Sequence, residues 1–176
     1  SQTTVQLLNA GYKVTVVDSL VNSSPKSLER VRELVGEEKA KNLAFVEADL
    51  VDKPALEAAL SSVGKIDSCI HFAGLKAVGE SVKLPLLYYH NNLTGTFFLL
   101  EVLKKQGCCK IVFSSSATVY GTAVPPLTES SQAGVGITNP YGRTKFMLEE
   151  IFRDVVRSDK NFGVVLLRYF NPVGAH

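Results

Sequence analysis

Two hydrophobic periods alternate along the chain. Short runs of β-branched and other apolar residues are separated by longer stretches in which apolar residues recur every three or four positions. The short runs predict strands at Tyr12–Asp18, Leu43–Ala48, Ser68–Phe72, Lys110–Ser114 and Val164–Tyr169. The longer stretches predict helices from Ser1 to Gly11, from Pro25 to Gly36, from Pro54 toward Gly64, from Pro85 to Gly107 and from Tyr141 to Arg157.

This alternation is typical of right-handed βαβ units, and it predicts an α/β fold of the Rossmann type. The expected architecture is a doubly wound parallel sheet with helices on both faces, forming one domain over residues 1–176. Ligands of such sheets bind outside the carboxyl ends of the strands. Small or polar residues lie at all five predicted ends: Asp18, Asp49, Ala73-Gly74, Ser114 to Ser116, and Phe170-Asn171. A common ligand site at this edge is therefore expected.

Composition narrows the possible partners. The formal charge of the 176 residues is only +2 and the cationic side chains are scattered, so neither nucleic acid nor an anionic membrane is an expected partner. No apolar run approaches the roughly 18 residues that span a bilayer. The three cysteines, Cys69, Cys108 and Cys109, lack metal-ligand spacing, so we expect reduced thiols, no metal site and a cytoplasmic location.

Tyr141 and Lys145 are the first candidates for chemistry. Four residues apart at the start of a predicted helix, they lie on one face, where an ammonium favours the ionised form of a phenol. That is a general acid/base arrangement, although the same spacing also occurs on many solvated helices. His71 and His90 have no ligand-spaced partner and are expected to be core or surface residues. Glu149 and Glu150 are expected on a solvated helix face.

Asp18 is a candidate for the adenosine ribose. An acid at the end of the second strand of a dinucleotide-binding fold accepts bonds from the ribose hydroxyls and repels a 2′-phosphate, which favours NAD over NADP. A solvated strand-end aspartate is the alternative. The glycine-rich turn that should precede such a strand is not in the sequence, which predicts a fragment lacking the first strand.

Four long motifs carry a resemblance to a known family. They are Ile70 to Ser81 (IHFAGLKAVGES), Phe113 to Gly121 (FSSSATVYG), Pro140 to Lys145 (PYGRTK) and Leu167 to His176 (LRYFNPVGAH). In this order they resemble the nucleotide-sugar epimerases of the extended short-chain dehydrogenase/reductase family, and the resemblance extends over the whole chain.

The resemblance implies an NAD-dependent interconversion of UDP-glucose and UDP-galactose by reversible hydride transfer at sugar C4, through a 4-keto sugar. It implies a catalytic set of Ser116, Tyr141 and Lys145. Tyr141 would take the proton of the 4-hydroxyl, Lys145 would hydrogen-bond the nicotinamide ribose and favour the phenolate, and Ser116 would hydrogen-bond the 4-oxygen. Asn171, together with Ser116 and Tyr141, would contact the nucleotide-sugar, and the family is often dimeric.

It also implies a set of residues that bind the cofactor, including the catalytic three. The further members are Asp18, Ser19, Leu20, Val21, Asn22 and Ser23 at the adenosine ribose, Asp49 and Leu50 near the adenine, Phe72, Ala73, Gly74, Leu75 and Lys76 at the pyrophosphate and ribose, and Asn91 and Phe170 at the nicotinamide end.

Two alternatives remain open. A 4,6-dehydratase or decarboxylase of the same fold would need an added acid and base, commonly directly after the catalytic serine, where this chain has Ala117 and Thr118. A non-catalytic nucleotide-binding module is the other alternative. The resemblance also implies that a C-terminal substrate domain is missing from this sequence. For the 176-residue chain by itself, we therefore expect neither tight NAD binding nor turnover.

Overall fold

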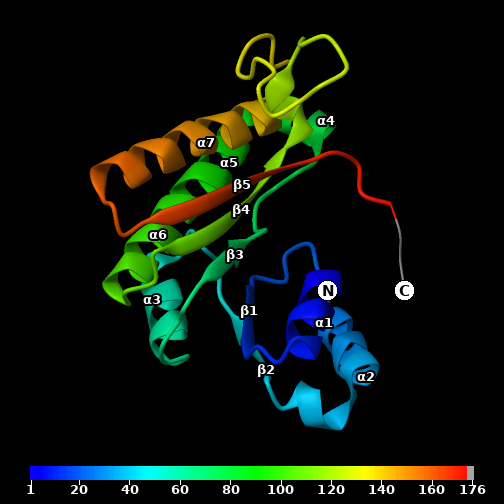
Figure 1. The fold of residues 1–176 in the computed structure, drawn as a ribbon, viewed down its shortest axis with the longest axis vertical. Helices are drawn as coiled ribbons and strands as arrows, with labels where there is room; N and C mark the ends of the chain where they lie inside the picture. Colours follow the sequence, from blue (N-terminus) through cyan, green and yellow to red (C-terminus); the bar gives the residue numbers. More distant parts are fainter. Residues whose placement is uncertain (174–176) are drawn as a thin grey trace. The chain divides into compact units, whose positions relative to one another are not determined.

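The computed structural model describes residues 1–173 and contains two compact units, Ser1–Gly64 and Lys65–His176. Both units are built from parallel strands connected by helices (Figure 1). Residues 174–176, which end the last of the four motifs, lie outside the described part.

The first unit is a two-stranded parallel sheet with its helices. Its elements are α1 (Gln2–Asn9), β1 (Val14–Asp18), α2 (Lys26–Ala40), β2 (Leu43–Glu47) and α3 (Lys53–Ser61). The strands pair from Val14↔Leu43 to Asp18↔Glu47. Apolar residues spaced three or four apart in α1 and α2 share one helix face and form the core together with Leu43 of β2. The helical members are Val5, Leu8, Leu28, Val31 and Val35.

Gly36 does not end α2, contrary to the sequence prediction. Its backbone has φ 78° and ψ 164°, a conformation that glycine adopts without a Cβ penalty, and helical structure resumes and continues to Ala40. Glycine therefore breaks the helical path locally, and the residues after it form another turn.

The second unit contains a three-stranded parallel sheet in the order β3-β4-β5. Its elements are β3 (Cys69–His71), α4 (Val78–Lys83), α5 (Pro85–Tyr89), η1, a π-helical turn (His90–Thr94), α6 (Gly95–Lys105), β4 (Lys110–Ser116), η2, a 3₁₀ turn (Ala117–Tyr120), α7 (Pro140–Ser158) and β5 (Gly163–Tyr169). All five predicted strands are present, and every pair is parallel.

The helix predicted from Pro85 to Gly107 is three consecutive segments, α5, η1 and α6. The central π-helical turn interrupts the regular hydrogen-bond pattern, a feature that is frequent at functional sites. α4 was not predicted at all, because its six residues are too few to show a helical period.

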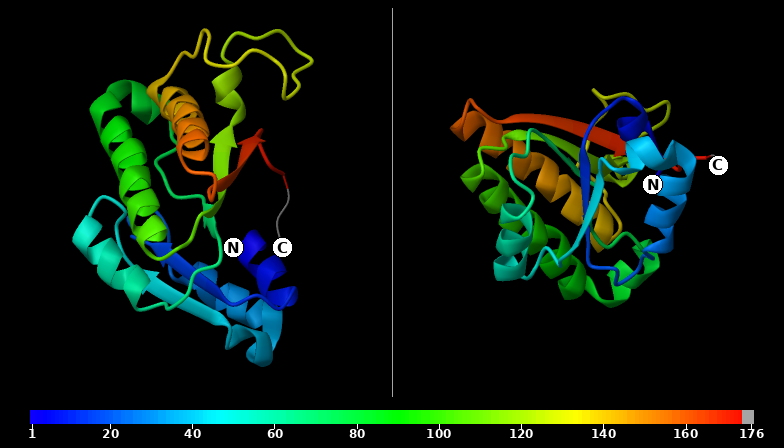
Figure 2. Two further views of the ribbon diagram at one scale, coloured as in Figure 1. Left: turned by 60° about the vertical axis from the view of Figure 1, so that its left-hand side comes forward. Right: turned by 90° about the horizontal axis from the view of Figure 1, so that it is seen from below.

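The helices of the second unit lie along one face of its sheet (Figure 2). α7 packs against β4 and β5 and against α4 and α5. Phe113 of β4 and Phe152 of α7 meet with ring centroids 4.9 Å apart, and both are fully buried. The opposite face of β5 exposes Val165, Leu167 and Tyr169, as the two-residue alternation of a strand requires.

Residues 1–173 contain neither a candidate membrane-spanning helix nor a candidate metal cluster. None of the helices has the length and apolar character that crossing a bilayer requires. Within the same residues, no three His, Cys, Asp or Glu side chains group as metal ligands. All three cysteines are free thiols.

Candidate active site

The first turn of α7 carries Tyr141. The helix starts here because the Asn139 side chain accepts a bond of 2.8 Å from the backbone N–H of Gly142, and because Pro140 occupies the first helical position, where no N–H donor is needed. The phenol is thus attached to the end of a nineteen-residue helix where the helix dipole is positive.

Lys145 lies one turn further on, with only 4% of the residue exposed. Its ammonium donates a bond of 2.7 Å to the backbone carbonyl of Ser114 and lies 6.0 Å from the ring centroid of Tyr141 and 4.8 Å from that of Phe113. Burial lowers the pKa of Lys145 to about 8, because desolvation disfavours the charged form. The expected shared face of Tyr141 and Lys145 is therefore present.

Ser116 is the last residue of β4, two positions after the carbonyl that Lys145 binds. It is buried, and its Oγ accepts bonds from the backbone N–H of Thr118 (3.2 Å) and from the Thr118 hydroxyl (2.9 Å). These bonds turn the chain from β4 into η2 and fix the hydroxyl of Ser116 beside that turn.

Gly142 allows α7 to approach this turn. A Cβ built at Gly142 would lie 3.0 Å from Thr118 Oγ1 and 3.0 Å from Ile137 Cγ2, closer than nearly all side chains tolerate. The backbone next to Tyr141 therefore contacts the threonine that holds Ser116. The sequence analysis did not identify this role, although a glycine inside a helical pattern often has such a packing reason.

The end of β3 is held by a buried amide, Asn92 of the π-helical turn. Asn92 Oδ1 accepts from the backbone N–H of Leu75 (2.8 Å) and from Asn91 Nδ2 (3.0 Å). Its Nδ2 donates to the carbonyl of Leu75 (3.0 Å) and to Thr144 Oγ1 (3.1 Å). Asn92 thus joins the segment from Phe72 to Lys76 to the helix that carries Lys145.

Gly74 fits closely against this amide. Its φ is +145°, which favours glycine, and an added Cβ would lie 3.2 Å from Asn92 Oδ1. Phe72, Ala73 and Lys76 are exposed around it, while Leu75 is partly buried. The structure thus gathers the five cofactor residues expected after β3 into one turn and places Asn91 beside it.

Tyr88 also holds the segment that follows β3. Its hydroxyl donates to Glu80 Oε2 (2.6 Å) and accepts from the backbone N–H of Ala77 (3.0 Å), directly after Lys76. Burial, followed by the bond to Glu80, raises the pKa of Tyr88 to about 12, so this phenol stays neutral. Tyr88 therefore supports the loop and does not act as a base.

His71 is a core residue, as expected. Its Nε2 lies 2.8 Å from Thr96 Oγ1, and the Thr96 hydroxyl donates to the carbonyl of Asn92 (2.7 Å). Burial lowers the pKa of His71 to about 3, with a further contribution from the charge of Lys145, so its imidazole is neutral.

Phe170 and Asn171 follow β5 and are exposed. The Phe170 ring lies 6.4 Å from that of Tyr120 in η2, and Phe72 lies 6.4 Å from Tyr169. Residues from the ends of β3, β4 and β5 are therefore neighbours within this unit, as expected for the carboxyl edge of a parallel sheet.

The first unit carries the remaining cofactor candidates at the ends of β1 and β2. Asp18 Oδ1 accepts from the backbone N–H of Leu20 and from Ser23 Oγ, both at 2.8 Å, and Leu20 adopts a left-handed φ of 57°. Ser19, Val21 and Asn22 complete this tight turn. After β2, Asp49 Oδ1 accepts from the N–H of Val51 (3.0 Å), next to the partly buried Leu50.

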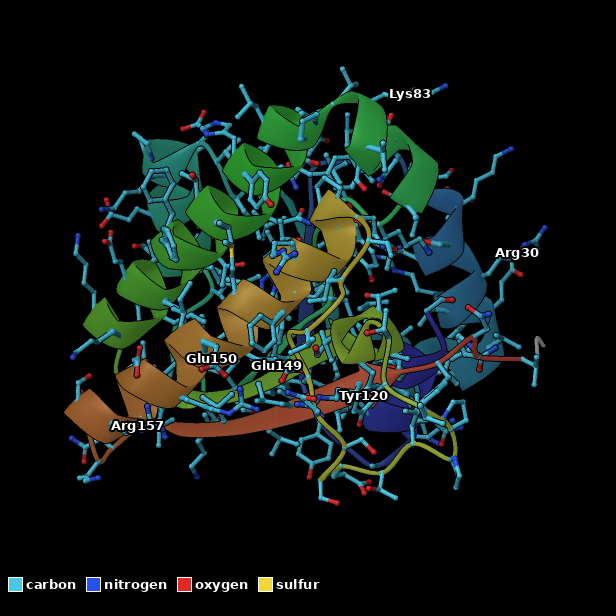
Figure 3. The ribbon with its side chains drawn as sticks, turned by 90° about the horizontal axis from the view of Figure 1, so that it is seen from above. Arg30, Lys83, Tyr120, Glu149, Glu150 and Arg157 are labelled. Atoms are coloured by element: carbon cyan, nitrogen blue, oxygen red, sulfur yellow. The ribbon has the colours of Figure 1, made fainter. Side chains whose placement is uncertain are left out.

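Glu149 corrects one sequence prediction. It was expected on a solvated face with Glu150, but it is fully buried, whereas Glu150 is exposed (Figure 3). Burial opposes its ionisation, but hydrogen bonds from Arg168 and Ser115 outweigh that effect and hold the pKa of Glu149 below its ordinary value. Adjacent glutamates on a helix point in different directions, and one of these directions leads into the core.

These features define a class of protein: a Rossmann-type parallel α/β fold with a serine at one strand end and a Tyr-x-x-x-Lys helix, as in nucleotide-dependent short-chain dehydrogenases/reductases. The chain belongs to the NAD dependent epimerase/dehydratase family, whose model matches residues 1–176.

Individual relatives agree with this assignment. The chain is 56% identical over 177 residues to UDP-glucose 4-epimerase of Bacillus subtilis (strain 168) and 58% identical to UDP-glucose 4-epimerase 2 of Arabidopsis thaliana, covering all of this chain but 50% and 49% of those proteins. The crystal structure of UDP-glucose 4-epimerase from Bifidobacterium longum in complex with NAD⁺ and UDP superposes with a TM-score of 0.92 at 51% identity, covering 99% of this chain and 50% of that one. The chain thus spans about half the length of these relatives.

Proposed function

We propose that this chain is the NAD-binding part of an enzyme that interconverts UDP-glucose and UDP-galactose by reversible hydride transfer at sugar C4. One observation carries the proposal: the buried ammonium of Lys145 lies 6.0 Å from the ring of Tyr141 and binds the strand that ends at Ser116. The relatives named UDP-glucose 4-epimerase support the choice of substrate.

The described residues fit a dinucleotide. Asp18 accepts the bonds from Leu20 and Ser23 at Oδ1, which leaves Oδ2 as an acceptor for a ribose hydroxyl. Phe72, Ala73 and Lys76 are exposed in the segment after β3, and Lys76 supplies a cation suited to a pyrophosphate. In the first unit, Asp18 to Ser23, with Asp49 and Leu50, would hold the adenosine end of NAD. In the second unit, Phe72 to Lys76, Asn91, Lys145 and Phe170 would hold the remainder of the cofactor.

Bound NAD would supply the acceptor and donor of the C4 hydride. The chain's own residues manage the proton. Tyr141, as the base, takes the proton of the 4-hydroxyl, with the buried Lys145 ammonium 6.0 Å from the centroid of its ring. Lys145 has three N–H donors, and since one binds the Ser114 carbonyl, two are left for a ribose.

Ser116 completes the set. Its Oγ already accepts two bonds from Thr118, so its own hydrogen is left to donate to the sugar 4-oxygen. Asn171, exposed after β5, would contact the nucleotide-sugar.

The geometry of η2 supports an epimerase over a dehydratase. Ala117 has no acid or base group, and the Thr118 hydroxyl is used to bind Ser116. An enzyme that removes water across C5 and C6 needs a further proton donor and acceptor at this point.

We also propose that the enzyme is a cytoplasmic homodimer. The three free thiols fit a reducing compartment. Large exposed apolar side chains on and beside α4 and α5, namely Val82, Leu84, Leu86 and Leu87, fit a contact with a second copy. The test is sedimentation of a chimera that joins residues 1–176 to the remaining half of a relative. Leu86→Glu in this chimera should yield monomers, whereas the control Val124→Glu, at an equally exposed loop position, should leave the dimer intact.

A chimera tests the proposed activity. Residues 1–176 replace the matching half of the Bacillus subtilis relative, and conversion of UDP-galactose to UDP-glucose is measured with the chimera and with the 176-residue chain. We expect activity only in the chimera and a loss of roughly 10²–10⁴-fold on Tyr141→Phe, the usual contribution of a general acid/base. A folded, NAD-containing chimera without epimerase activity would refute the proposal.

A further inference from the structure

Glu149 of α7 is a fully buried carboxylate that accepts four hydrogen bonds. Ser115 Oγ donates at 2.5 Å, and Arg168 donates twice, from Nε at 2.9 Å and from NH2 at 2.7 Å. Arg153 NH2 donates at 3.1 Å from the following turn of the same helix. The two bonds from Arg168 form the bidentate geometry that fixes orientation as well as distance.

The two partners of Glu149 in the sheet, Ser115 and Arg168, belong to one pair of the β4–β5 ladder. The next pair of this ladder joins Ser116 with Tyr169. Glu149 therefore fastens α7 to the sheet one residue before Ser116. On its own helix, Glu149 lies one turn, about 5.4 Å, beyond Lys145.

The network continues to the end of β5. The guanidinium of Arg168 lies 4.8 Å from the ring centroid of Tyr120, and Tyr120 contacts the Phe170 ring. Arg168 NH1 also donates to the carbonyl of Glu129 (3.4 Å). One carboxylate thus connects the elements that carry Lys145, Ser116 and Phe170.

Stability alone does not require this arrangement. A buried ion pair loses the hydration of both charges, and well-packed apolar residues of the same volume are often at least as stable. What the ion pair adds is a unique register, because the bonds form only when α7, β4 and β5 are correctly aligned.

We propose that Glu149 is a positioning residue, which holds the Tyr141–Lys145 turn of α7 in register with Ser116 of β4 through Ser115 and Arg168. The inference rests on the proposed function. Proton transfer tolerates little misplacement, since a shift of about 1 Å can reduce the rate roughly 10²-fold. A shift of α7 relative to β4 should therefore lower kcat more than it raises KM.

The test uses the chimera with Glu149→Gln, which retains size but not charge. The matched control is Glu150→Gln, because Glu150 is the exposed neighbour and pairs with Arg153 on the surface of the same helix. We expect Glu149→Gln to lower kcat about 10-fold or more with KM for UDP-galactose within about twofold, and Glu150→Gln to leave both within twofold.

Two further variants separate positioning from folding. Glu149→Gln combined with Ser115→Ala should be no slower than Glu149→Gln alone, because both changes break the same connection. Arg168→Lys, which keeps the charge but loses the bidentate fork, should also lower kcat. Amide hydrogen exchange of the chimera should rise at residues 114–117 and 168–170 in Glu149→Gln and stay unchanged in β1 and β2.

The outcomes are distinct. If the active chimera keeps its kcat after Glu149→Gln and only melts at a lower temperature, the residue is structural and the inference is wrong. If the fold-losses in kcat of Glu149→Gln and Ser115→Ala multiply in the double variant, the two residues act independently, and the proposed connection from Glu149 through Ser115 is wrong. An unsubstituted chimera that folds and holds NAD but does not epimerise refutes the proposed function, and this role with it.

Discussion

The buried ammonium of Lys145 should make the stability of the chain depend on alkaline pH. Burial lowers the pKa of Lys145 from 10.5 to about 8, whereas the unfolded chain retains the ordinary value. Between these two pH values the unfolded state binds more protons than the folded state, so the free energy of unfolding rises with pH.

The size of the effect follows from the two pKa values. At pH 7 the charged, desolvated lysine destabilises the fold by about 3 kcal/mol relative to a neutral side chain, and at pH 9.5 by about 1 kcal/mol. Raising the pH from 7 to 9.5 should therefore stabilise the native chain by about 2 kcal/mol through this one group.

Lys145→Met isolates this contribution, because other groups titrate alike in both proteins. Urea unfolding of the 176-residue chain, followed by circular dichroism, gives the stability of each at both pH values. The variant loses the bond to the Ser114 carbonyl at either pH. The informative quantity is therefore how the difference in unfolding free energy between wild type and variant changes with pH.

Between pH 7 and 9.5, we expect the unfolding free energy of the wild type to rise by about 2 kcal/mol relative to that of the variant. Lys83→Met, a change at an exposed position of α4, should show a stability difference from wild type that is the same at both pH values. A pH-independent difference for Lys145→Met would show that Lys145 is solvated and would refute the argument that burial tunes it.

Three further predictions concern the framework of the site. Gly121→Ala should lower the free energy of unfolding by more than about 3 kcal/mol, because the new Cβ would lie 2.0 Å from a backbone oxygen. Gly107→Ala, where the space is open but φ is positive, should lower it by about 1 kcal/mol, and urea unfolding measures both changes. Asn92→Leu should lower the free energy of unfolding by about 2–5 kcal/mol and weaken NADH binding by the chimera, because the backbone N–H and carbonyl of Leu75 lose their partners. Unchanged NADH binding would contradict the proposal that Asn92 shapes the cofactor segment after β3. The pKa of Glu149 is lowered from 4.5, so its ionised form should stabilise the fold above about pH 4.5, and this stabilisation should be lost as the pH falls further. In urea unfolding at several acidic pH values, the free energy of unfolding of Glu149→Gln should therefore fall less steeply with decreasing pH than that of the wild type.

Periodicity predicted the strands well. Buried parallel strands consist of short apolar runs, and all five were located from such runs. The polar residues after them were also found, because ligand sites of parallel sheets lie at the carboxyl ends, which the order of elements identifies.

Long-range hydrogen bonds were not predictable. Asn92 bonds to Leu75, 17 residues away, and Glu149 bonds to Ser115, 34 residues away. Nothing local in the sequence distinguishes these polar residues from solvated ones, since their burial depends on which elements pack together. For Glu149 this produced a wrong prediction, and for Asn92 the sequence analysis drew attention only to its neighbour Asn91.

Short or irregular elements also escaped prediction. α4 and the π-helical turn contain six and five residues, too few for a period to be visible. Gly36 was interpreted as a stop because glycine often ends helices, yet here it only interrupts one.

Isotope transfer tests the central claim, hydride transfer at C4 with Tyr141 as the base. The chimera is given UDP-galactose deuterated at C4 of the sugar, and the product is analysed by mass spectrometry and NMR. Because the hydride leaves C4 and returns to it, we predict UDP-glucose that retains the deuterium at C4, and almost no product from Tyr141→Phe. Loss of the label to water, or a dehydrated product, would contradict the account.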